Sequence, residues 1–439
     1  MGSLSRGYAR RAEASPPCNG LRAPGGTLDA DAVIVGAGAA GLWAAAAVAR
    51  AGKRVILVEK TVRAGTKILA SGGTRCNLTT TLGPTEAARL FGPGEAFVTP
   101  ALRALTPAAV RARFLALGVP TVEEPGLEKV FPASQRATDV RNALLEDAEF
   151  AGVALWYRTE VTGLARIEGG WRVGTSAGPV DAPAVLVCPG GQSYPRTGTT
   201  GDGYRWLREL GLTVVPPVPA LVPLASDEPW VHALSGIAVQ DTVARLLDPT
   251  DRVVARRARP VLFTHRGLSG PGTMDLSIHV AQRPEARWTV AIDLLPHQDL
   301  DAVRAELLAA AGRPGGPHLA RVLEAGLRGR EPIPARLLAA VIRQAGISAD
   351  NPPLHQVERK VRNRLADALK GLRVPIAGTL GWDEAEVTGG GLALSEVDPR
   401  TLEVHRHPGL YVFGELLDLT GPIGGLNFQA AFATAELAA

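Results

Sequence analysis

Three glycines within six residues are the clearest chemical signal in the chain. Gly36, Gly38 and Gly41 have the spacing G-x-G-x-x-G, directly after an apolar run and at the start of a helical pattern. At this spacing the first glycine permits a tight turn, the second lets the backbone approach a pyrophosphate, and the third allows close packing of helix on strand. The N-terminus of the helix would face the phosphates with free N–H groups, so we expect Ala39 and Ala40 to belong to the same site.

A carboxylate follows at the position that a bound dinucleotide requires. Glu59 directly follows the next predicted strand, 54–58, and lies 18 residues after Gly41. A carboxylate at this point accepts a hydrogen bond from a ribose hydroxyl. The glycine spacing alone is weak, whereas strand, glycines, helix, strand and acid in this order predict a dinucleotide site, with Lys60 beside it.

Two further segments favour FAD as the dinucleotide. Residues 65–77 (GTKILASGGTRCN) combine small residues with Lys, Ser, Arg and Asn, which suits a loop along a long polar cofactor. Residues 410–429 combine an apolar run, an acidic turn and a glycine pair that opens a helix, whose N-terminus can stabilise negative charge on a reduced flavin ring. From these segments the cofactor site is expected to include Lys67, Ser71, Gly72, Arg75, Cys76, Asn77, Gly414, Glu415, Asp418, Gly424, Gly425, Leu426 and Asn427. Outside them, Val161, Gly190 and Gly191 are also expected to contact the cofactor.

The elements that must position these residues follow from hydrophobic periodicity. Residues 31–35, 41–51 and 54–58 predict a strand, a helix and a strand, which begin an α/β fold with a parallel sheet. Helical patterns then occupy 84–91, 99–117 and 136–151. Residues 153–187 indicate an antiparallel meander that returns to a buried strand, and the proline-dense segment 214–224 indicates the entry into an insert.

These patterns predict one domain interrupted by another. We expect an FAD-binding domain formed by 30–195 and 375–439, a β-rich inserted substrate domain at 196–298 and a helical subdomain at 299–374. Residues 1–29 contain arginines but no apolar segment of a secretory signal, and we interpret them as a disordered tail.

Composition excludes several classes of protein. An apolar share of 46% and a charged share of 21% over 439 residues are typical of globular proteins. Three cysteines form no disulfide framework, which favours a reducing, cytoplasmic location. The uncharged stretch 32–49 is interrupted by glycines, so we expect neither a membrane span nor a membrane partner.

The positive charge is concentrated in the predicted insert. Residues 196–374 contain 24 Lys and Arg against 18 Asp and Glu, whereas the whole chain has a net charge of only +4. A solvated helix face or a polyanion-binding surface would explain the excess. Its local concentrations are Arg252, Arg256, Arg257, Arg259 and Arg266, and then Arg359, Lys360, Arg362, Arg364, Lys370 and Arg373.

An ordered set of motifs resembles one known family. Besides the glycine turn, the set comprises GTKILASGGTRCNLT (65–79), GGQSYPRTGTTGDGY (190–204), PALVPL (219–224), FTHRGLSGPG (263–272), VTGGG (387–391) and GELLDLTGPIGGLNFQAA (414–431). This set is similar to that of the BaiN/YhiN-like NAD(P)/FAD-dependent oxidoreductases. The chain departs from the family pattern where Cys188-Pro189 replaces a usual threonine before the glycine pair, and where Thr74 replaces a usual glycine.

The resemblance implies a fold and a type of reaction. The fold is a two-dinucleotide-binding-type FAD domain interrupted by a β-barrel-like unit and a helical unit. The family's activities are reductions of conjugated C=C bonds, with one branch similar to bile-acid-type enone reductases and another to ribosomal RNA dihydrouridine synthases. The expected substrate is therefore uracil in ribosomal RNA or a small enone.

Reduction of a polarised C=C bond needs a hydride, a proton donor and a group that polarises the carbonyl. Cys76 and Tyr194 are candidate donors, although either side chain could instead serve packing. His265 and Arg266 could polarise a carbonyl or bind a phosphate, and a structural role is equally compatible with them. No second strand-embedded G-x-G-x-x-G is present, so NAD(P)H, the expected electron donor, would bind without a Rossmann domain of its own.

Two other functions remain open from the sequence. One is a flavin oxidase or monooxygenase, and the other is a flavin-bearing RNA-binding protein without turnover. A metal site is not expected, because the sequence contains no HExxH, no CxxC and no clustered histidines. The oligomeric state cannot be derived from these patterns.

Overall fold

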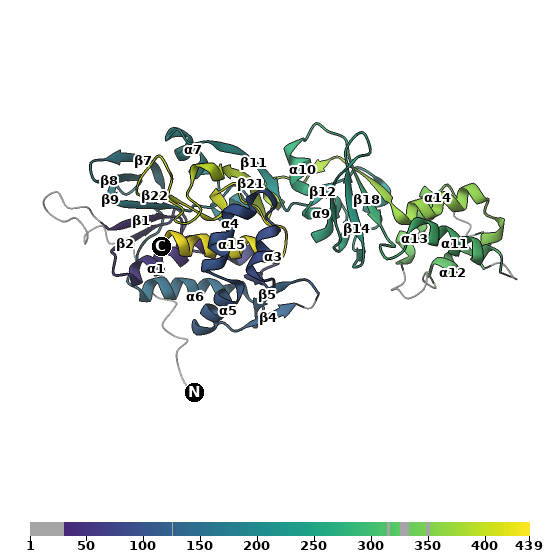
Figure 1. The fold of residues 1–439 in the computed structure, drawn as a ribbon, viewed down its shortest axis with the longest axis horizontal. Helices are drawn as coiled ribbons and strands as arrows, with labels where there is room; N and C mark the ends of the chain where they lie inside the picture. Colours follow the sequence, from purple (N-terminus) through teal and green to yellow (C-terminus); the bar gives the residue numbers. More distant parts are fainter. Residues whose placement is uncertain (1–29, 125, 314–316, 325–332, 348–351) are drawn as a thin grey trace. The chain divides into compact units, whose positions relative to one another are not determined.

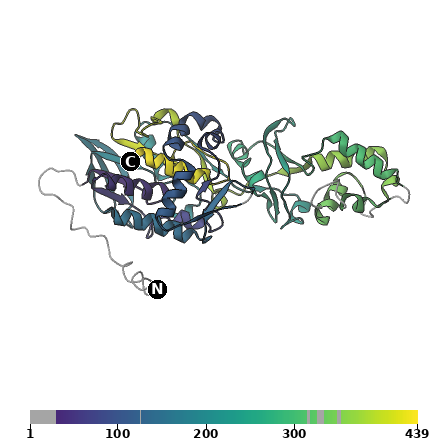
Figure 2. The ribbon, with the colours of Figure 1, turned by 60° about the horizontal axis from the view of Figure 1, so that its bottom comes forward.

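A computed structural model of the chain describes residues 30–124, 126–313, 317–324, 333–347 and 352–439. These residues divide into two compact units, which Figures 1 and 2 draw from two directions. Unit 1 comprises the chain up to Pro217 and from Thr388, and unit 2 comprises Val218–Val387. The predicted disordered tail, 1–29, lies outside the described residues.

These boundaries differ from the predicted domain limits. Residues 196–217 group with unit 1 and 375–387 with unit 2. The reason at the first boundary is packing, because Tyr204, Trp206 and Leu207 are buried in the hydrophobic core of unit 1. The division of the insert into a β-rich and a helical domain stays a prediction.

Unit 1 is built on a five-stranded parallel sheet. The strand order is β22 (Leu410–Val412), β10 (Ala184–Val187), β1 (Ala32–Val35), β2 (Val55–Val58) and β6 (Ala154–Trp156). The central strands β1 and β2 are apolar without alternation because both of their faces are buried.

Two helices from opposite ends of the chain pack together in unit 1. The ribbon in Figure 1 shows α1 (Ala39–Arg50) beside α15 (Leu426–Ala438). The rings of Trp43 and Phe432 lie 4.9 Å apart, and Trp43 Nε1 donates a hydrogen bond of 2.6 Å to Glu436. This packing places both helices within one core.

The helical pattern 99–117 proves to be two helices, α4 (Glu95–Ala104) and α5 (Pro107–Ala116). The break occurs because Thr106 Oγ1 accepts from Ala109 N at 3.2 Å as an N-cap, and Pro107 suits a first helical turn. The other helices of unit 1 are α2 (Thr66–Ala70), α3 (Pro84–Arg89), α6 (Ala137–Phe150) and α7 (Asp202–Glu209).

Small antiparallel sheets complete unit 1. The predicted meander is present as β7 (Val161–Ile167), β8 (Gly170–Thr175) and β9 (Val180–Ala182). A second small sheet has the order β3 (Thr79–Thr80), β5 (Lys129–Pro132) and β4 (Thr121–Glu124). The chain enters and leaves unit 2 through β11 (Val214–Ala220) and β21 (Val387–Leu392).

Unit 2 contains two antiparallel sheets and a group of helices over one continuous core. One sheet has the order β13 (Ala238–Val239), β16 (Val261–Thr264), β17 (Gly267–Ser269), β12 (Leu224–Ala225) and β20 (Gly378–Thr379). The other has the order β15 (Val253–Arg257), β14 (Val243–Leu247), β18 (Trp288–Asp293) and β19 (Leu372–Ile376). The helices are α8 (Pro229–His232), α9 (Pro271–Met274), α10 (Ser277–Gln282), α11 (Leu300–Ala311), α12 (Leu319–Glu324), α13 (Ala335–Gln344) and α14 (Arg359–Lys370).

Among the helices of the described residues, none is both long and apolar enough to cross a bilayer. Within the same residues, no group of His, Cys, Asp and Glu side chains is arranged to hold a metal ion.

Candidate functional site

The three glycines between β1 and α1 meet different surroundings. Gly36 has φ +101°, and a Cβ there would lie 2.8 Å from the carbonyl oxygen of Cys188. A side chain at Gly41 would collide with the carbonyl oxygen of Gly36. A Cβ at Gly38, in contrast, would meet no atom of the protein within 4 Å. The turn is therefore closed by protein at its first and third glycines and open at the second, as backbone contact with a phosphate requires.

Glu59 is held against this turn by two backbone donors. Its Oε2 accepts from Ala37 N at 3.0 Å, and its Oε1 accepts from Thr61 N at 2.8 Å. The carboxylate is half-buried at the carboxyl end of β2. Each oxygen keeps a lone pair for a further donor, such as a ribose hydroxyl.

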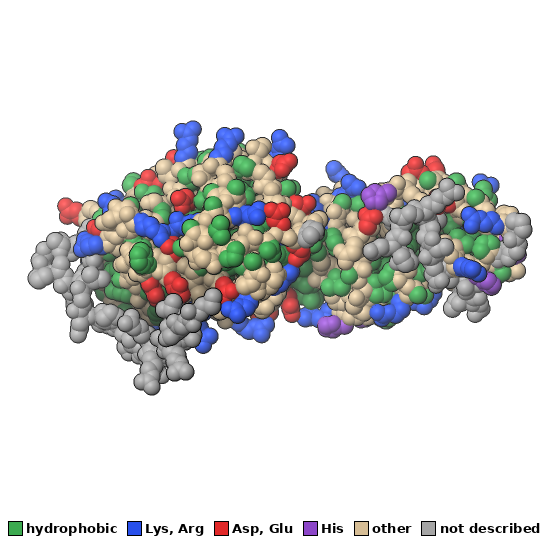
Figure 3. Space-filling model, turned by 90° about the horizontal axis from the view of Figure 1, so that it is seen from below, with side chains coloured by type: hydrophobic (Ala, Val, Ile, Leu, Met, Phe, Trp, Pro, Cys, Tyr) green, Lys and Arg blue, Asp and Glu red, His purple; other side chains and the backbone are tan. Residues whose placement is uncertain are grey.

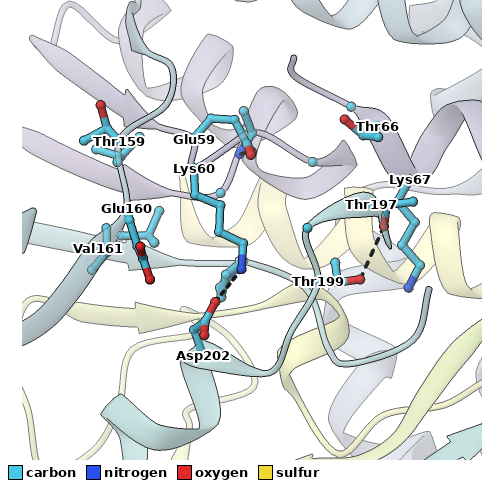
Figure 4. Close-up of a pocket in the computed structure, with 18 of the residues that line it drawn as sticks. Glu59, Lys60, Thr66, Lys67, Thr159, Glu160, Val161, Thr197, Thr199 and Asp202 are labelled. Carbon is cyan, nitrogen blue, oxygen red and sulfur yellow. Dashed lines mark hydrogen bonds and ion pairs between the residues drawn. The ribbon is translucent and has the colours of Figure 1, made fainter. Parts of the chain in front are cut away.

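A cleft of about 600 Å³, open solvent included, lies at the carboxyl ends of β1 and β2, where ligands bind in open α/β sheets. Figure 4 shows its lining. Six residues of the predicted cofactor set line it: Gly36, Gly38, Glu59, Lys60, Lys67 and Val161. Polar and aromatic lining residues that the sequence reasoning did not identify include Thr66, Thr159, Glu160, Thr197, Thr199, Asp202 and Trp206.

Lys60 connects two segments of the cleft wall. Its Nζ lies 2.5 Å from Asp202 Oδ2 and 2.6 Å from Thr200 Oγ1, and Figure 4 shows the contact with Asp202. Burial alone would raise the pKa of Asp202, but the hydrogen bonds from Lys60 and Thr200 outweigh it and hold that pKa below its ordinary value. Asp202 lies within the motif 190–204, but local spacing does not single it out, because its partner Lys60 lies 142 positions earlier.

Lys67 connects the loop after β2 with the C-terminal segment. Its Nζ donates to Ser193 Oγ at 2.6 Å and to both oxygens of Glu415, at 2.8 and 2.6 Å. Glu415 also accepts from Ser193 Oγ at 2.8 Å and from Thr388 N at 2.9 Å. Predicted residues 348 positions apart thus form one network, whose further members Ser193 and Thr388 lie within motifs of the family resemblance.

The glycine pair before Ser193 leaves room for this network. A side chain at Gly191 would collide with Thr388 Oγ1, and a Cβ at Gly190, where φ is +85°, would lie 2.8 Å from Thr199 Cγ2. Gly414, with φ +70°, approaches Ala40 in the same way, since a Cβ added at Gly414 would lie 3.2 Å from the Ala40 methyl group. These glycines let backbone segments approach closely around the cleft.

The loop 71–77 lies against the start of α15. Gly425 has φ +81°, and a Cβ there would collide with Thr79 O and lie 2.9 Å from Asn77 Oδ1. Asn77 Oδ1 also accepts from Val130 N at 3.2 Å. The two segments that favoured FAD in the sequence are therefore neighbours in the fold.

Other predicted cofactor residues have structural contacts of their own. Asn427 forms two hydrogen bonds of 2.9 Å with the backbone of Gly421, which shapes the turn through Gly424, and Leu426 is buried. Burial raises the pKa of Asp418, opposed by a hydrogen bond from the backbone of Gly390. Cofactor contacts of these residues stay predictions.

Arg75 reaches the small sheet beside the loop. Its Nη1 lies 3.0 Å from Glu124 and 3.2 Å from Gln135, and its guanidinium lies 4.1 Å from the centre of the Phe131 ring. Its charge is thus already paired within unit 1. Its predicted contact with a cofactor would require these interactions to change.

The turn around Arg75 is tight. Gly72 has φ +54°, and a Cβ there would lie 2.9 Å from Asn77 N, while Ser71 Oγ donates to Ile68 O at 2.7 Å. Thr74 has φ +68°, a left-handed conformation that glycine adopts without strain. This explains in physical terms why glycine suits that position in the family pattern.

Cys76 is completely buried. Burial raises the pKa of its thiol to about 12, opposed by a hydrogen bond with Ser71. Such a thiol stays protonated at neutral pH and is screened from solvent, so the structure supports packing as its role. Cys188 is also buried, and burial together with the charge of Glu59 raises its pKa.

The other predicted catalytic residues belong to different units. Tyr194 is partly exposed in unit 1 and has φ +54° at the turn before Thr197, whose hydroxyl donates to its carbonyl at 2.8 Å. His265 and Arg266 are exposed in the hairpin turn between β16 and β17 of unit 2. Arg266 Nη1 lies 3.4 Å from Glu384. The catalytic roles of all three stay predictions.

The residues that surround the glycine turn fit FAD. The open position at Gly38, the N-terminus of α1 and the oriented carboxylate of Glu59 match a pyrophosphate followed by a ribose, and the glycine-rich contacts continue to α15.

Comparison with known proteins gives near full-length matches. A family model described as the HI0933-like protein Rossmann domain matches residues 30–439. The chain is 32% identical over 416 residues to the ribosomal RNA dihydrouridine synthase of Escherichia coli (strain K12), covering 92% of this chain and 96% of that protein. It is 31% identical over 409 residues to the Haemophilus influenzae protein of the same name, covering 92% and 96%. It is 31% identical over 410 residues to the 3-dehydro-bile acid delta(4,6)-reductase of Clostridium scindens, covering 92% and 97%.

These findings confirm two predictions. The fold is a Rossmann-like FAD-binding α/β fold, and the protein is an FAD-dependent oxidoreductase. The chain therefore belongs to the HI0933-like family, as its resemblance to the BaiN/YhiN-like flavoproteins implied.

Proposed function

We propose that this protein reduces the conjugated C=C bond of uracil in ribosomal RNA to give dihydrouridine, with NAD(P)H as electron donor. The observation that carries the proposal is the similarity to two ribosomal RNA dihydrouridine synthases over more than nine-tenths of this chain and of both relatives. The uracil ring is a polarised C=C acceptor conjugated to a carbonyl, the type of bond for which a flavin hydride is suited.

Bound FAD would supply the hydride that reduces this bond. The glycine turn and the N-terminus of α1 would bind its pyrophosphate, and Glu59 would accept from a ribose hydroxyl. Lys60 and Asp202 would hold the cleft wall beside it. The N-terminus of α15, which begins after Gly425, would place positive dipole charge beside the ring.

Tyr194 is the proton donor in this proposal. Its hydroxyl belongs to a partly exposed side chain of unit 1, whereas the Cys76 thiol is completely buried. A donor must approach the carbon next to the one that receives hydride, which a solvent-accessible side chain can do without unfolding its own loop.

A small enone is the second candidate substrate. The relative from Clostridium scindens, 31% identical, is named as a bile acid reductase, and its substrate differs from RNA in size and charge. Both candidates require the same hydride and proton transfer, so only the acceptor distinguishes them.

Anaerobic stopped-flow absorbance tests the proposal in two steps. The oxidised protein is first mixed with NADPH or NADH, and we expect the flavin absorbance to bleach within seconds. The reduced protein is then mixed with unmodified ribosomal RNA or with a 3-keto-4-ene steroid, and we expect RNA to restore the absorbance faster. Absence of bleaching with both nicotinamides would contradict the proposed donor, and re-oxidation by the steroid alone would contradict the proposed substrate.

A further inference from the structure

A row of arginines crosses one sheet of unit 2. In the order β15–β14–β18–β19, Arg256 lies opposite Arg245, Arg245 opposite Ala291, and Ala291 opposite Arg373. Residues in direct register share one face of a sheet. Because neighbouring strands lie about 4.8 Å apart, the row spans about 14 Å and is interrupted only by Ala291.

The row lies on the face of the sheet that turns away from the core. Successive side chains of a strand point to opposite faces, and the neighbours of the row, Leu246, Val290 and Val374, are fully buried in the core of unit 2. Arg256 and Arg373 are exposed, and Arg245 is half-buried. Arg256 and Arg373 therefore face solvent, whereas Arg245 is partly covered, because its Nε is buried.

This arrangement is electrostatically unfavourable without a ligand, because like charges directly opposite each other on a sheet repel. Arg245 Nη2 donates to the carbonyl oxygen of Lys370, and Arg245 forms no ion pair with a carboxylate of the described residues. Arg373 pairs with Asp251, but both side chains are more than half exposed, and such pairs contribute little. Within the described part of unit 2, Arg256 forms no ion pair with a carboxylate.

More cations continue this face at the edge strand β19. Gln344 Nε2 donates to Arg373 O at 3.4 Å, which places the end of α13 beside β19. Arg343 is exposed there, and Arg364 Nε donates to Ala345 O at 3.0 Å. Arg245, Arg256, Arg343, Arg364 and Arg373 together are called the arginine surface below.

Three other basic residues of unit 2 have close carboxylates. Arg257 and Arg259 lie within 3.7 and 3.6 Å of the buried Asp275 carboxylate, and Lys370 lies 2.7 Å from Asp293. Figure 3 shows a similar mixture of both signs over the face of unit 1 that it draws. Arg256 and Arg343 differ from Arg257, Arg259 and Lys370, because both are exposed and neither pairs with a carboxylate among the described residues.

We propose that the arginine surface binds the phosphate backbone of the RNA substrate, an inference that rests on the proposed function. A periodic row of guanidiniums matches a chain of phosphates, and arginine is well suited to phosphate recognition. The row contains no aromatic side chain on which bases could stack, so it supplies affinity without reading sequence.

The experiment compares two double variants of the full-length protein with bound FAD. Arg256→Ala/Arg343→Ala removes two exposed charges of the surface, whereas Arg89→Ala/Arg103→Ala removes two exposed charges of unit 1 as a matched control. Binding of a fluorescein-labelled oligouridine of about 20 nucleotides, longer than common single-strand site sizes, is measured by anisotropy at several salt concentrations. Flavin content and NADPH bleaching are recorded for each protein.

We expect the surface variant to lose two phosphate contacts. At about 0.7 released counterions per contact, the slope of log K against log salt becomes shallower by about 1.4, and Kd rises about 25-fold at 0.1 M salt. The control variant should bind like wild type, and all proteins should bleach equally, because the substitutions lie outside the cofactor site.

The possible failures are distinguishable. If wild type reduces uracil in ribosomal RNA but the surface variant binds RNA as tightly as the control variant, the arginine surface is wrong and the proposed function stands. If wild type neither binds nor reduces RNA, the proposed function fails, and this inference fails with it.

Discussion

The different surroundings of Gly38 and Gly41 allow a sharp test of the cofactor site. Alanine at Gly38 adds a methyl group where the protein has no atom within 4 Å, whereas alanine at Gly41 collides with the backbone oxygen of Gly36. Gly38→Ala should therefore affect bound FAD and leave the fold intact, and Gly41→Ala should disturb the fold itself.

The expected magnitudes follow from these contacts. Gly38 has φ −80°, a conformation open to alanine, and it is the N-cap of α1, where alanine is less favourable than glycine. The entropy gain of about 0.4–1 kcal/mol should offset this cost, so the stability of the apo-protein should change by less than about 1 kcal/mol. If the pyrophosphate approaches Gly38 as proposed, the methyl group crowds it at about 1–3 kcal/mol, which weakens FAD binding about 5- to 150-fold. Gly41→Ala should cost the apo-protein about 1–3 kcal/mol or more, because its obstacle is backbone.

The assay separates the two effects. Thermal unfolding of the apo-protein, followed by circular dichroism, gives the change in stability, and titration with FAD, followed by flavin fluorescence, gives Kd. Wild-type FAD affinity in Gly38→Ala would refute the placement of the pyrophosphate at this turn. A loss of stability in apo Gly38→Ala as large as that in Gly41→Ala would contradict the open space at Gly38.

Four further outcomes are expected. Lys60→Met should release FAD several-fold faster than wild type in a fluorescence chase, with the exposed Lys53→Met as control, because it removes the contact with Asp202. Lys67→Met should lower the free energy of unfolding by about 1–3 kcal/mol, because it leaves the Glu415 carboxylate without its ion-pair partner. The double variant Lys67→Met/Glu415→Gln should recover part of the Tm that Lys67→Met loses, and no recovery would contradict the pairing. Cys76→Ala should retain the turnover and the pH profile of the wild type between pH 6 and 9. Because the pKa of the thiol is about 12 in the folded protein, the wild type should lose stability as the pH rises from about 9 towards 12, and the variant should lose less. Tyr194→Phe should slow re-oxidation by the C=C acceptor while NADPH bleaching continues at the wild-type rate, and equal slowing of both steps would contradict its role as proton donor.

Local patterns predict the cofactor turn because all of its parts are close in sequence. The strand β1, the glycines, α1 and Glu59 lie within 28 residues, and each has a specific requirement for turn, approach or packing. The motifs likewise indicate FAD because 65–77 and 410–429 have the composition of cofactor loops. Their adjacency, at Gly425 and Asn77, is a property of the folded chain alone.

The remainder of the site depends on pairings between distant segments. Asp202 and Ser193 are ordinary polar residues in the sequence, and only the fold brings them to Lys60 and Lys67. Cys76 illustrates the reverse case, since its motif suggests reactivity whereas its complete burial supports packing. The arginine row is similarly hidden, because register places Arg245, Arg256 and Arg373 together.

The central claim is tested most directly by the mass of the nucleosides in the product RNA. Purified protein is incubated anaerobically with NADPH and an unmodified ribosomal RNA transcript, which is then digested to nucleosides and analysed by mass spectrometry. We predict a uridine that has gained two hydrogen atoms, in an amount that matches the NADPH consumed, and its loss when FAD is removed. NADPH oxidation that leaves every uridine unchanged would contradict the claim that this protein reduces uracil in RNA.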